Sequence, residues 1–236
     1  MATLRRWSLT LTTAAITAAV LLVGGILLFA QQGTIDMHAL TRGPRTPRAT
    51  APPPTQSRVT PQAGPEGVPL VSGAALGPAR SPAPGRSSGG IPCGSREQLV
   101  YHVHARLTIF INGKPRAVPL GVGIGGPRQV DHTASGAFVA GGRCFSFLHT
   151  HAADGVIHIE APGKVVFKLG QFFDVWRQRL DSRHLGSARG RVTAYVDGHR
   201  FKGDPRAIPL HKHTQIELEL GHPRVRPATI QFPTNL

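Results

Sequence analysis

An alternating stretch near the middle of the chain constrains the fold most strongly. From residue 101 the sequence reads YHVHARLTIFI, with apolar residues at the odd positions 103–111 and His102 and His104 among the even ones. Side chains of a strand point alternately to its two faces, so the pattern predicts a strand with one core face and one polar face. Asn112-Gly113 follows, and because both residues tolerate positive φ, we expect a hairpin whose second strand begins near Pro115.

A second histidine pair with the same spacing occurs in another β-like segment. CFSFL at 144–148 runs into HTH at 149–151, a short turn at 152–155 and then VIHIEAP. Residues two apart on a strand share a face and can offer two imidazoles to one ion. The turn returns the chain, which predicts that His158 lies near His149 and His151. His102 and His104 join this cluster only if their strand lies alongside.

These five histidines predict a site for Zn²⁺ or Cu²⁺, since neutral imidazoles bind both ions well. Asp154 and Glu160 are then available as an oxygen ligand or as acceptors for imidazole N–H groups. Two alternatives stay open: a purely structural hydrogen-bond network, and a catalytic zinc centre with Asp154 or Glu160 as general base. The chain has no H-E-x-x-H motif, so the sequence leans away from an enzyme and names no catalytic residue. The other histidines are interpreted as surface or turn residues: His38, His132, His184, His199, His211, His213 and His222.

The N-terminal region predicts a membrane anchor and a stalk. Residues 7–30 carry no charge and are long enough to cross a bilayer as a helix, so we expect a signal anchor after a cytoplasmic tail at 1–6. A cleaved signal peptide is the alternative. Residues 31–92 are rich in Pro, Gly and Arg, which predicts a disordered linker in which Glu66 is the one acid between residues 37 and 92.

Cysteine and charge bear on the compartment and the partners. The two cysteines, Cys93 and Cys144, could form a disulfide outside the cytoplasm, although two unrelated thiols are the alternative. The net charge of +15 is spread along the chain without a basic helix, so nucleic-acid binding is not predicted. We therefore expect a globular domain at 93–221 outside the cytoplasm, tethered to the cell membrane, followed by a C-terminal tail at 222–236.

The C-terminal half predicts a mixed α and β arrangement. KVVFKL indicates a strand, GQFFDVWRQRL an amphipathic helix, RVTAYVDGHRF a strand with a turn at Asp197-Gly198, and residues 215–220 a last strand. From about residue 155, AYVDG at 194–198 and IPLHKHTQIELEL at 208–220 resemble the ubiquitin-like β-grasp fold of small sulfur-carrier proteins. The resemblance concerns the fold only, since those carriers act through a C-terminal Gly-Gly and this chain ends FPTNL. The predicted fold class is α+β, with a β-grasp-like mixed sheet and one main helix.

The whole domain also resembles a family of uncharacterised exported bacterial proteins. The segments that carry this resemblance are IPCGS, HVHARLTIFINGKPRAVPLGVGI, CFSFLHTHAADGVIHIEAP, KLGQFFDVW and DPRAIPLHKH. The family has no established activity, so the resemblance implies only an exported, β-rich domain that carries histidines. The sequence thus predicts a membrane-tethered extracytoplasmic domain that binds zinc or copper for sensing, storage or delivery. A structural or interaction module without metal is the alternative.

Overall fold

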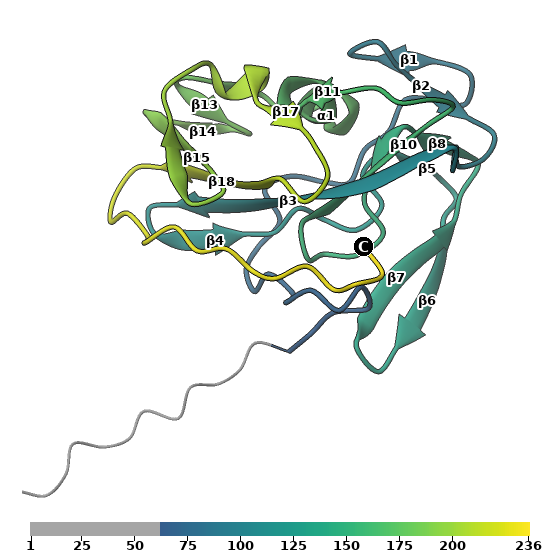
Figure 1. Cartoon of the computed structure of the whole chain (residues 1–236), viewed down its shortest axis with the longest axis horizontal. Helices are drawn as coiled ribbons and strands as arrows, with labels where there is room; N and C mark the ends of the chain where they lie inside the picture. The colour runs from purple at the N-terminus through teal and green to yellow at the C-terminus, as the bar shows by residue number, and fades with distance from the viewer. Residues whose placement is uncertain (1–61) are drawn as a thin grey trace, which may run out of the picture. The chain divides into compact units, whose positions relative to one another are not determined.

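One large sheet organises the chain in this computed structural model, which describes residues 62–236 (Figure 1). Its strand order is β16 (His199–Phe201), β15 (Val192–Val196), β18 (Gln215–Leu220), β3 (Tyr101–Ile111), β10 (Val156–Ala161) and β9 (Leu148–His149), and β4 (Lys114–Arg116) pairs with β3 outside this path. β3 and β18 run parallel, whereas the other neighbours are antiparallel. The long strand β3 therefore connects the two halves of the sheet.

The alternation along β3 determines which side chains enter the hydrophobic core. Ala105, Leu107 and Ile109 are fully buried, as the sequence predicts, and they share the hydrophobic core with α1 (Leu169–Trp176), the one α-helix of residues 62–236. Burying one large aliphatic side chain contributes roughly 1.5–3 kcal/mol, so this face of the sheet supplies much of the stability. The predicted hairpin after β3 is confirmed, because Asn112-Gly113 has φ values of 52° and 71° and β4 pairs back along β3.

The opposite face of the large sheet is polar but also covered. The C-terminal segment, yellow in Figure 1, runs along it and forms hydrogen bonds to polar side chains of β18. The Val225 N–H donates to Oε1 of Glu219, and the Gln215 side chain pairs with the backbone of Ile230. Residues 222–236, predicted as a tail, thus shield one part of this face.

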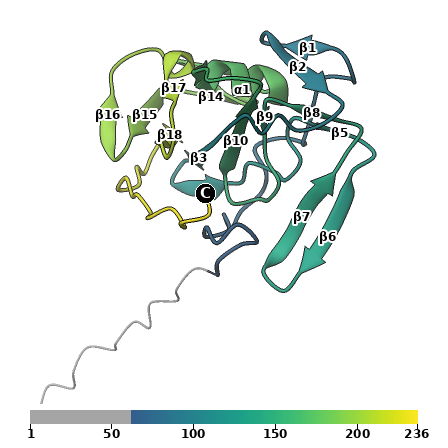
Figure 2. The ribbon, with the colours of Figure 1, turned by 45° about the vertical axis from the view of Figure 1, so that its right-hand side comes forward.

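A smaller sheet and a hairpin complete the region around the histidines. The small sheet has the order β1 (Ser87–Ser88), β2 (Ile91–Gly94), β8 (Cys144–Ser146) and β5 (Ile124–Gly125). A disulfide between Cys93 and Cys144 joins β2 to β8, which confirms the predicted pairing. The hairpin of β6 (Gln129–Thr133) and β7 (Gly136–Gly141) projects from the rest of the fold (Figure 2). The remaining elements are β11 (Phe167–Lys168), β12 (Leu180–Asp181), β13 (His184–Leu185), β14 (Ala188–Arg189), β17 (Pro209–Leu210) and the 3₁₀ helix η1 (Pro205–Ala207).

The predicted α+β fold class is wrong for the part of the chain that the structure describes. This part is mostly β, with 41 % of residues in strands and 6 % in helices. The predicted helix at 170–180 ends early, because Arg177 adopts a left-handed conformation with φ 56° and its N–H bonds back to Asp174. The predicted β-grasp-like unit from about residue 155 is not self-contained either, since its last strand, β18, pairs in parallel with β3.

Residues before the predicted domain start at residue 93 also take part in the fold. Residues 62–92, expected to belong to a disordered linker, contribute β1, part of β2 and the buried side chains of Glu66 and Val68. The predicted tail at 1–6, the membrane-spanning segment at 7–30 and the linker up to residue 61 lie outside the described residues. Within residues 62–236, no helix is long and apolar enough to span a membrane.

Candidate metal centre

Strand register brings the two histidine pairs and His158 onto one face of the large sheet. In β10, His158 is the direct cross-strand partner of His104 on β3 and of His149 on β9. Two residues further along β10, Glu160 is opposite His102. Strand β10 therefore lies between the two histidine pairs, and the adjacency on which the sequence-based cluster depended is present.

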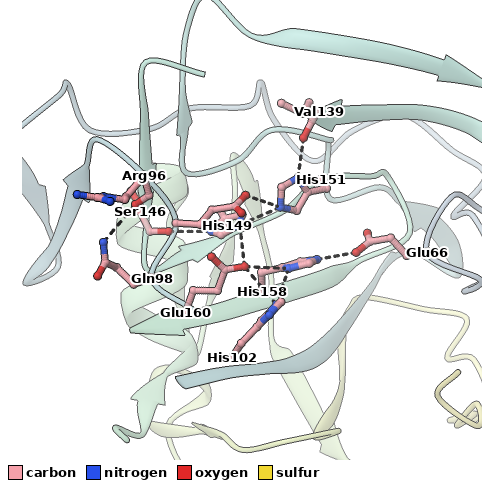
Figure 3. Close-up of polar contacts among 11 residues, drawn as sticks. Glu66, Arg96, Gln98, His102, Val139, Ser146, His149, His151, His158 and Glu160 are labelled. Carbon is pink, nitrogen blue, oxygen red and sulfur yellow. Dashed lines mark hydrogen bonds and ion pairs between the residues drawn. The ribbon is translucent and has the colours of Figure 1, made fainter. Parts of the chain in front are cut away.

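The clustered side chains are shielded from solvent to different degrees. His149 is 0 % exposed, His104 and His151 are each 5 % exposed and His158 is 7 % exposed, whereas the side chain of His102 is 34 % exposed. Figure 3 shows His102, His149, His151, His158 and Glu160 pointing toward one another. The cluster is thus a buried polar centre that reaches solvent at His102.

Backbone carbonyls orient the rings of His149 and His151 through their Nδ1 atoms. Nδ1 of His149 lies 2.8 Å from the Ser146 oxygen, and Nδ1 of His151 lies 2.6 Å from the Val139 oxygen. A carbonyl oxygen only accepts hydrogen bonds, so each Nδ1 carries the proton and each Nε2 presents a lone pair. These two Nε2 atoms are 3.0 Å apart. Burial and the neighbouring His158 lower the pKa of both rings, well below the ordinary value for His149, so a proton between them is disfavoured.

His158 is oriented by a carboxylate rather than by a carbonyl. Its Nε2–H donates to Oε1 of Glu66, and its Nδ1 faces the cluster 3.4 Å from Oε1 of Glu160. A ligating histidine commonly gives its other N–H to a carboxylate, which fixes the tautomer and strengthens the imidazole as a ligand. Burial alone would lower the pKa of His158, but the two carboxylates raise it to about 9. In the absence of an ion, His158 therefore carries a second proton at neutral pH.

Glu160 places a carboxylate oxygen at the centre of the cluster. Its Oε1 lies 3.2 Å from Nε2 of His102 and 3.7 Å from Nε2 of His149, while its Oε2 is buried with no hydrogen-bond partner among residues 62–236. At the rim, Oε1 of Glu97 lies 3.4 Å from Nε2 of His151. Two buried carboxylates, Glu66 and Glu160, thus supply negative charge to a group of imidazoles.

The donor atoms fall into two overlapping groups that could hold a metal ion. One consists of His149, His151, His158 and Glu160, all buried, and within it every pair of ligand atoms lies within 4.8 Å. A tetrahedral ion with bonds of about 2.0–2.1 Å has ligand atoms about 3.4 Å apart. The separations of 3.0 Å between the two Nε2 atoms, 3.4 Å from His158 to Glu160 and 3.7 Å from His149 to Glu160 are close to that value. The second group consists of His102, His104 and His158.

One carboxylate lacks the role that the sequence predicts for it, and another has a role that the sequence does not predict. Asp154 does not bind an imidazole N–H; its Oδ1 accepts the backbone N–H of Val156, and burial and the neighbouring Glu66 raise its pKa to about 8. The acceptor for His158 is Glu66, which sequence reasoning missed. The available signal was that Glu66 is the only acid between residues 37 and 92. The carbonyls of Val139 and Ser146 leave no signal in the sequence, because any residue type provides a carbonyl.

The remaining histidines that the structure describes lie elsewhere. His213 has φ 63° and its ring stacks on Phe232, in agreement with the predicted turn at this position. His132 and His199 are exposed on β6 and β16. Comparisons with known proteins give no match: no protein-family model, no curated protein and no solved structure matches this chain. The site must therefore be interpreted from its own chemistry.

Proposed function

We propose that this domain binds one Zn²⁺ or Cu²⁺ ion through His149, His151, His158 and Glu160. The observation that carries the proposal is the pair of Nε2 atoms, 3.0 Å apart, of His149 and His151. Because both Nδ1 atoms donate to carbonyls, neither Nε2 carries a hydrogen to offer the other. Two buried lone pairs at this distance repel each other unless a cation binds to both of them.

A hydrogen-bond network without metal accounts less well for this geometry. Such a network requires a donor between each pair of close acceptors, and buried polar groups without one are destabilising. A proton on either Nε2 would create a buried imidazolium, which the lowered pKa values of both rings oppose. A divalent ion satisfies both lone pairs together with the Glu160 carboxylate.

The donor types favour zinc or divalent copper. Imidazole nitrogen suits both ions, and a carboxylate oxygen completes a set of the kind found around zinc. Both cysteines are joined in the disulfide, so neither offers a thiolate. Glu160 and Glu66 carry two negative charges in total, which balance one divalent ion. Four protein donors fill a tetrahedral ion, which supports holding or delivering an ion over activating a water at an open position.

The disulfide supports a location in an oxidising compartment. Cys93 and Cys144 are 1 % and 0 % exposed, and disulfides of this kind persist mainly outside the cytoplasm. We therefore place the metal-binding domain in an exported protein, where it would store, sense or deliver the ion.

Metal binding by the full chain tests the proposal directly. The chain, kept in solution with a mild detergent, is stripped with a chelator, dialysed and titrated with Zn²⁺ and, separately, Cu²⁺ by calorimetry. We expect one ion per chain, and binding at least about a hundredfold weaker in the double variant His149→Gln, His151→Gln. The control His132→Gln changes an exposed histidine and should bind as the wild type does. A wild type that retains neither ion would refute the proposal.

A further inference from the structure

The two donor groups share a residue that can serve only one ion at a time. His158 belongs both to the buried group with His149, His151 and Glu160 and to the outer group with His102 and His104. Its Nε2–H is committed to Glu66, so a single lone pair, on Nδ1, is left for metal binding. The two groups therefore cannot both be complete with separate ions. They are alternative positions for the same ion.

The outer group contains a buried imidazole, that of His104, whose nitrogens have no hydrogen-bond partner among the described residues. His104 is 5 % exposed. Buried imidazoles are normally paired, so an unpaired one beside other ligands indicates a partner of another kind. The His104 ring centroid lies 4.5 Å from that of His102 and 4.4 Å from that of His158. Its unsatisfied nitrogens thus belong to the same cluster.

The outer group also connects the buried site to solvent. Nε2 of His102 lies 3.2 Å from Nδ1 of His158 and 3.2 Å from Oε1 of Glu160, both of which are ligands in the proposed inner site. The His102 side chain is 34 % exposed, whereas His149 is fully buried. An ion held by the inner group can therefore exchange its bonds to His149, His151 and Glu160 for bonds to His102 and His104 without leaving His158, the ligand that the two groups share.

Charge favours one ion that moves over two ions bound together. The carboxylates that face the cluster are Glu66 and Glu160, both buried, and Glu97 at the rim. Two divalent ions would place four positive charges in this buried space, more than these carboxylates can neutralise. Unbalanced buried charge is strongly destabilising.

We propose that His102 and His104, with His158, form a transfer position through which the ion enters and leaves the inner site. This inference rests on the proposed function, since it requires an ion in the inner site. The molecule that delivers the ion is then a metal chelate that gives up one of its ligands for His102, and the molecule that receives the ion is a metal-free chelator whose ligand replaces His102 at the surface. Exchange proceeds one ligand at a time, and the ion is never released bare from a buried site.

The rate of zinc release tests the transfer position separately from binding. Full chain loaded with one Zn²⁺ is mixed with excess 4-(2-pyridylazo)resorcinol, and the coloured complex is followed by stopped flow. For His102→Gln and His104→Gln we expect one ion still bound, with an affinity within about threefold of the wild type, and release slowed about tenfold or more. His132→Gln is the matched control and should release zinc at the wild-type rate.

Each outcome decides a different statement. Unchanged or faster release from His102→Gln, with one ion still bound, overturns the transfer position and leaves the proposed function intact. Two ions per wild-type chain also overturn it, because the groups would then be separate sites. A wild type that binds no ion overturns the proposed function and this inference with it. If His104→Gln does not fold, His102→Gln decides alone, since its side chain is partly exposed and its loss need not disturb the core.

Discussion

Removing the disulfide should lower the stability of the domain by an amount set by the loop that it closes. Cys93 and Cys144 are separated by 51 residues, and a cross-link over a loop of this size restricts the unfolded chain by about 4 kcal/mol. Both sulfurs are buried, so Cys93→Ala with Cys144→Ala also leaves a small cavity. For a domain of this size, a loss of about 4 kcal/mol lowers Tm by about 10 °C.

Urea unfolding at equilibrium measures this loss, and two forms of the protein separate its causes. Wild type reduced with a phosphine keeps the two cysteine side chains and loses only the cross-link. The double alanine variant loses the cross-link and the two sulfur atoms. Both forms should unfold at lower urea than the oxidised wild type. The chain-entropy reasoning is refuted if both lose less than about 1 kcal/mol. Zinc affinity should fall as well, by about tenfold, because β8 carries both Cys144 and the Ser146 carbonyl that orients His149.

Two further predictions concern pH and backbone geometry. The pKa of His158 is raised to about 9 in the folded protein from an ordinary value of 6.5. Its contribution to the unfolding free energy is therefore fully present below pH 6.5 and is lost as pH rises through 9. The unfolding free energy of the metal-free chain should therefore fall by about 3 kcal/mol between these values, and much less in His158→Gln, as urea titrations in the presence of a chelator would show. Gly155 and Gly85 both have positive φ, but a Cβ on Gly155 would collide with the Leu107 carbonyl and one on Gly85 meets nothing within 4 Å. In thermal unfolding, Gly85→Ala should cost about 1 kcal/mol and Gly155→Ala several times more; equal losses would contradict the role given to the collision.

Local patterns in the sequence predict the faces of the strands but not how the strands pair. Alternation alone places His102 and His104 on one side of a strand and Leu107 on the other, and the structure agrees. The position of His158 between the two histidine pairs depends on β3–β10 pairing, which joins segments about 50 residues apart. A single sequence carries no local signal for such a contact. For this reason the sequence identifies the five histidines as candidate ligands, but it does not predict their division into two overlapping groups.

Composition is a poor guide where a few specific contacts hold a segment that is rich in proline and glycine. Proline, glycine and arginine predict disorder throughout 31–92, yet residues 62–92 bury Val68 and bind His158 through Glu66. The helix was overestimated for a related reason. The apolar periodicity continues to Leu180, but the left-handed backbone at Arg177 ends the hydrogen-bonded turns at Trp176. Periodicity reports which side chains are buried, and it does not report where the backbone changes direction.

The row formed by His104, His158 and His149 across three strands has a consequence for folding. Successive side chains of a strand alternate between its two faces. A one-residue slip of β3 against β10 would therefore turn His102 and His104 toward α1 and bring Ala105 to the face that carries His158 and Glu160. A slipped chain would then lose the outer pair, and a slip of β9 would remove the inner ligand His149. An ion that binds only when these strands are aligned would stabilise chains with the correct strand register. Chains with a shifted register would gain no such stabilisation and would unfold more readily.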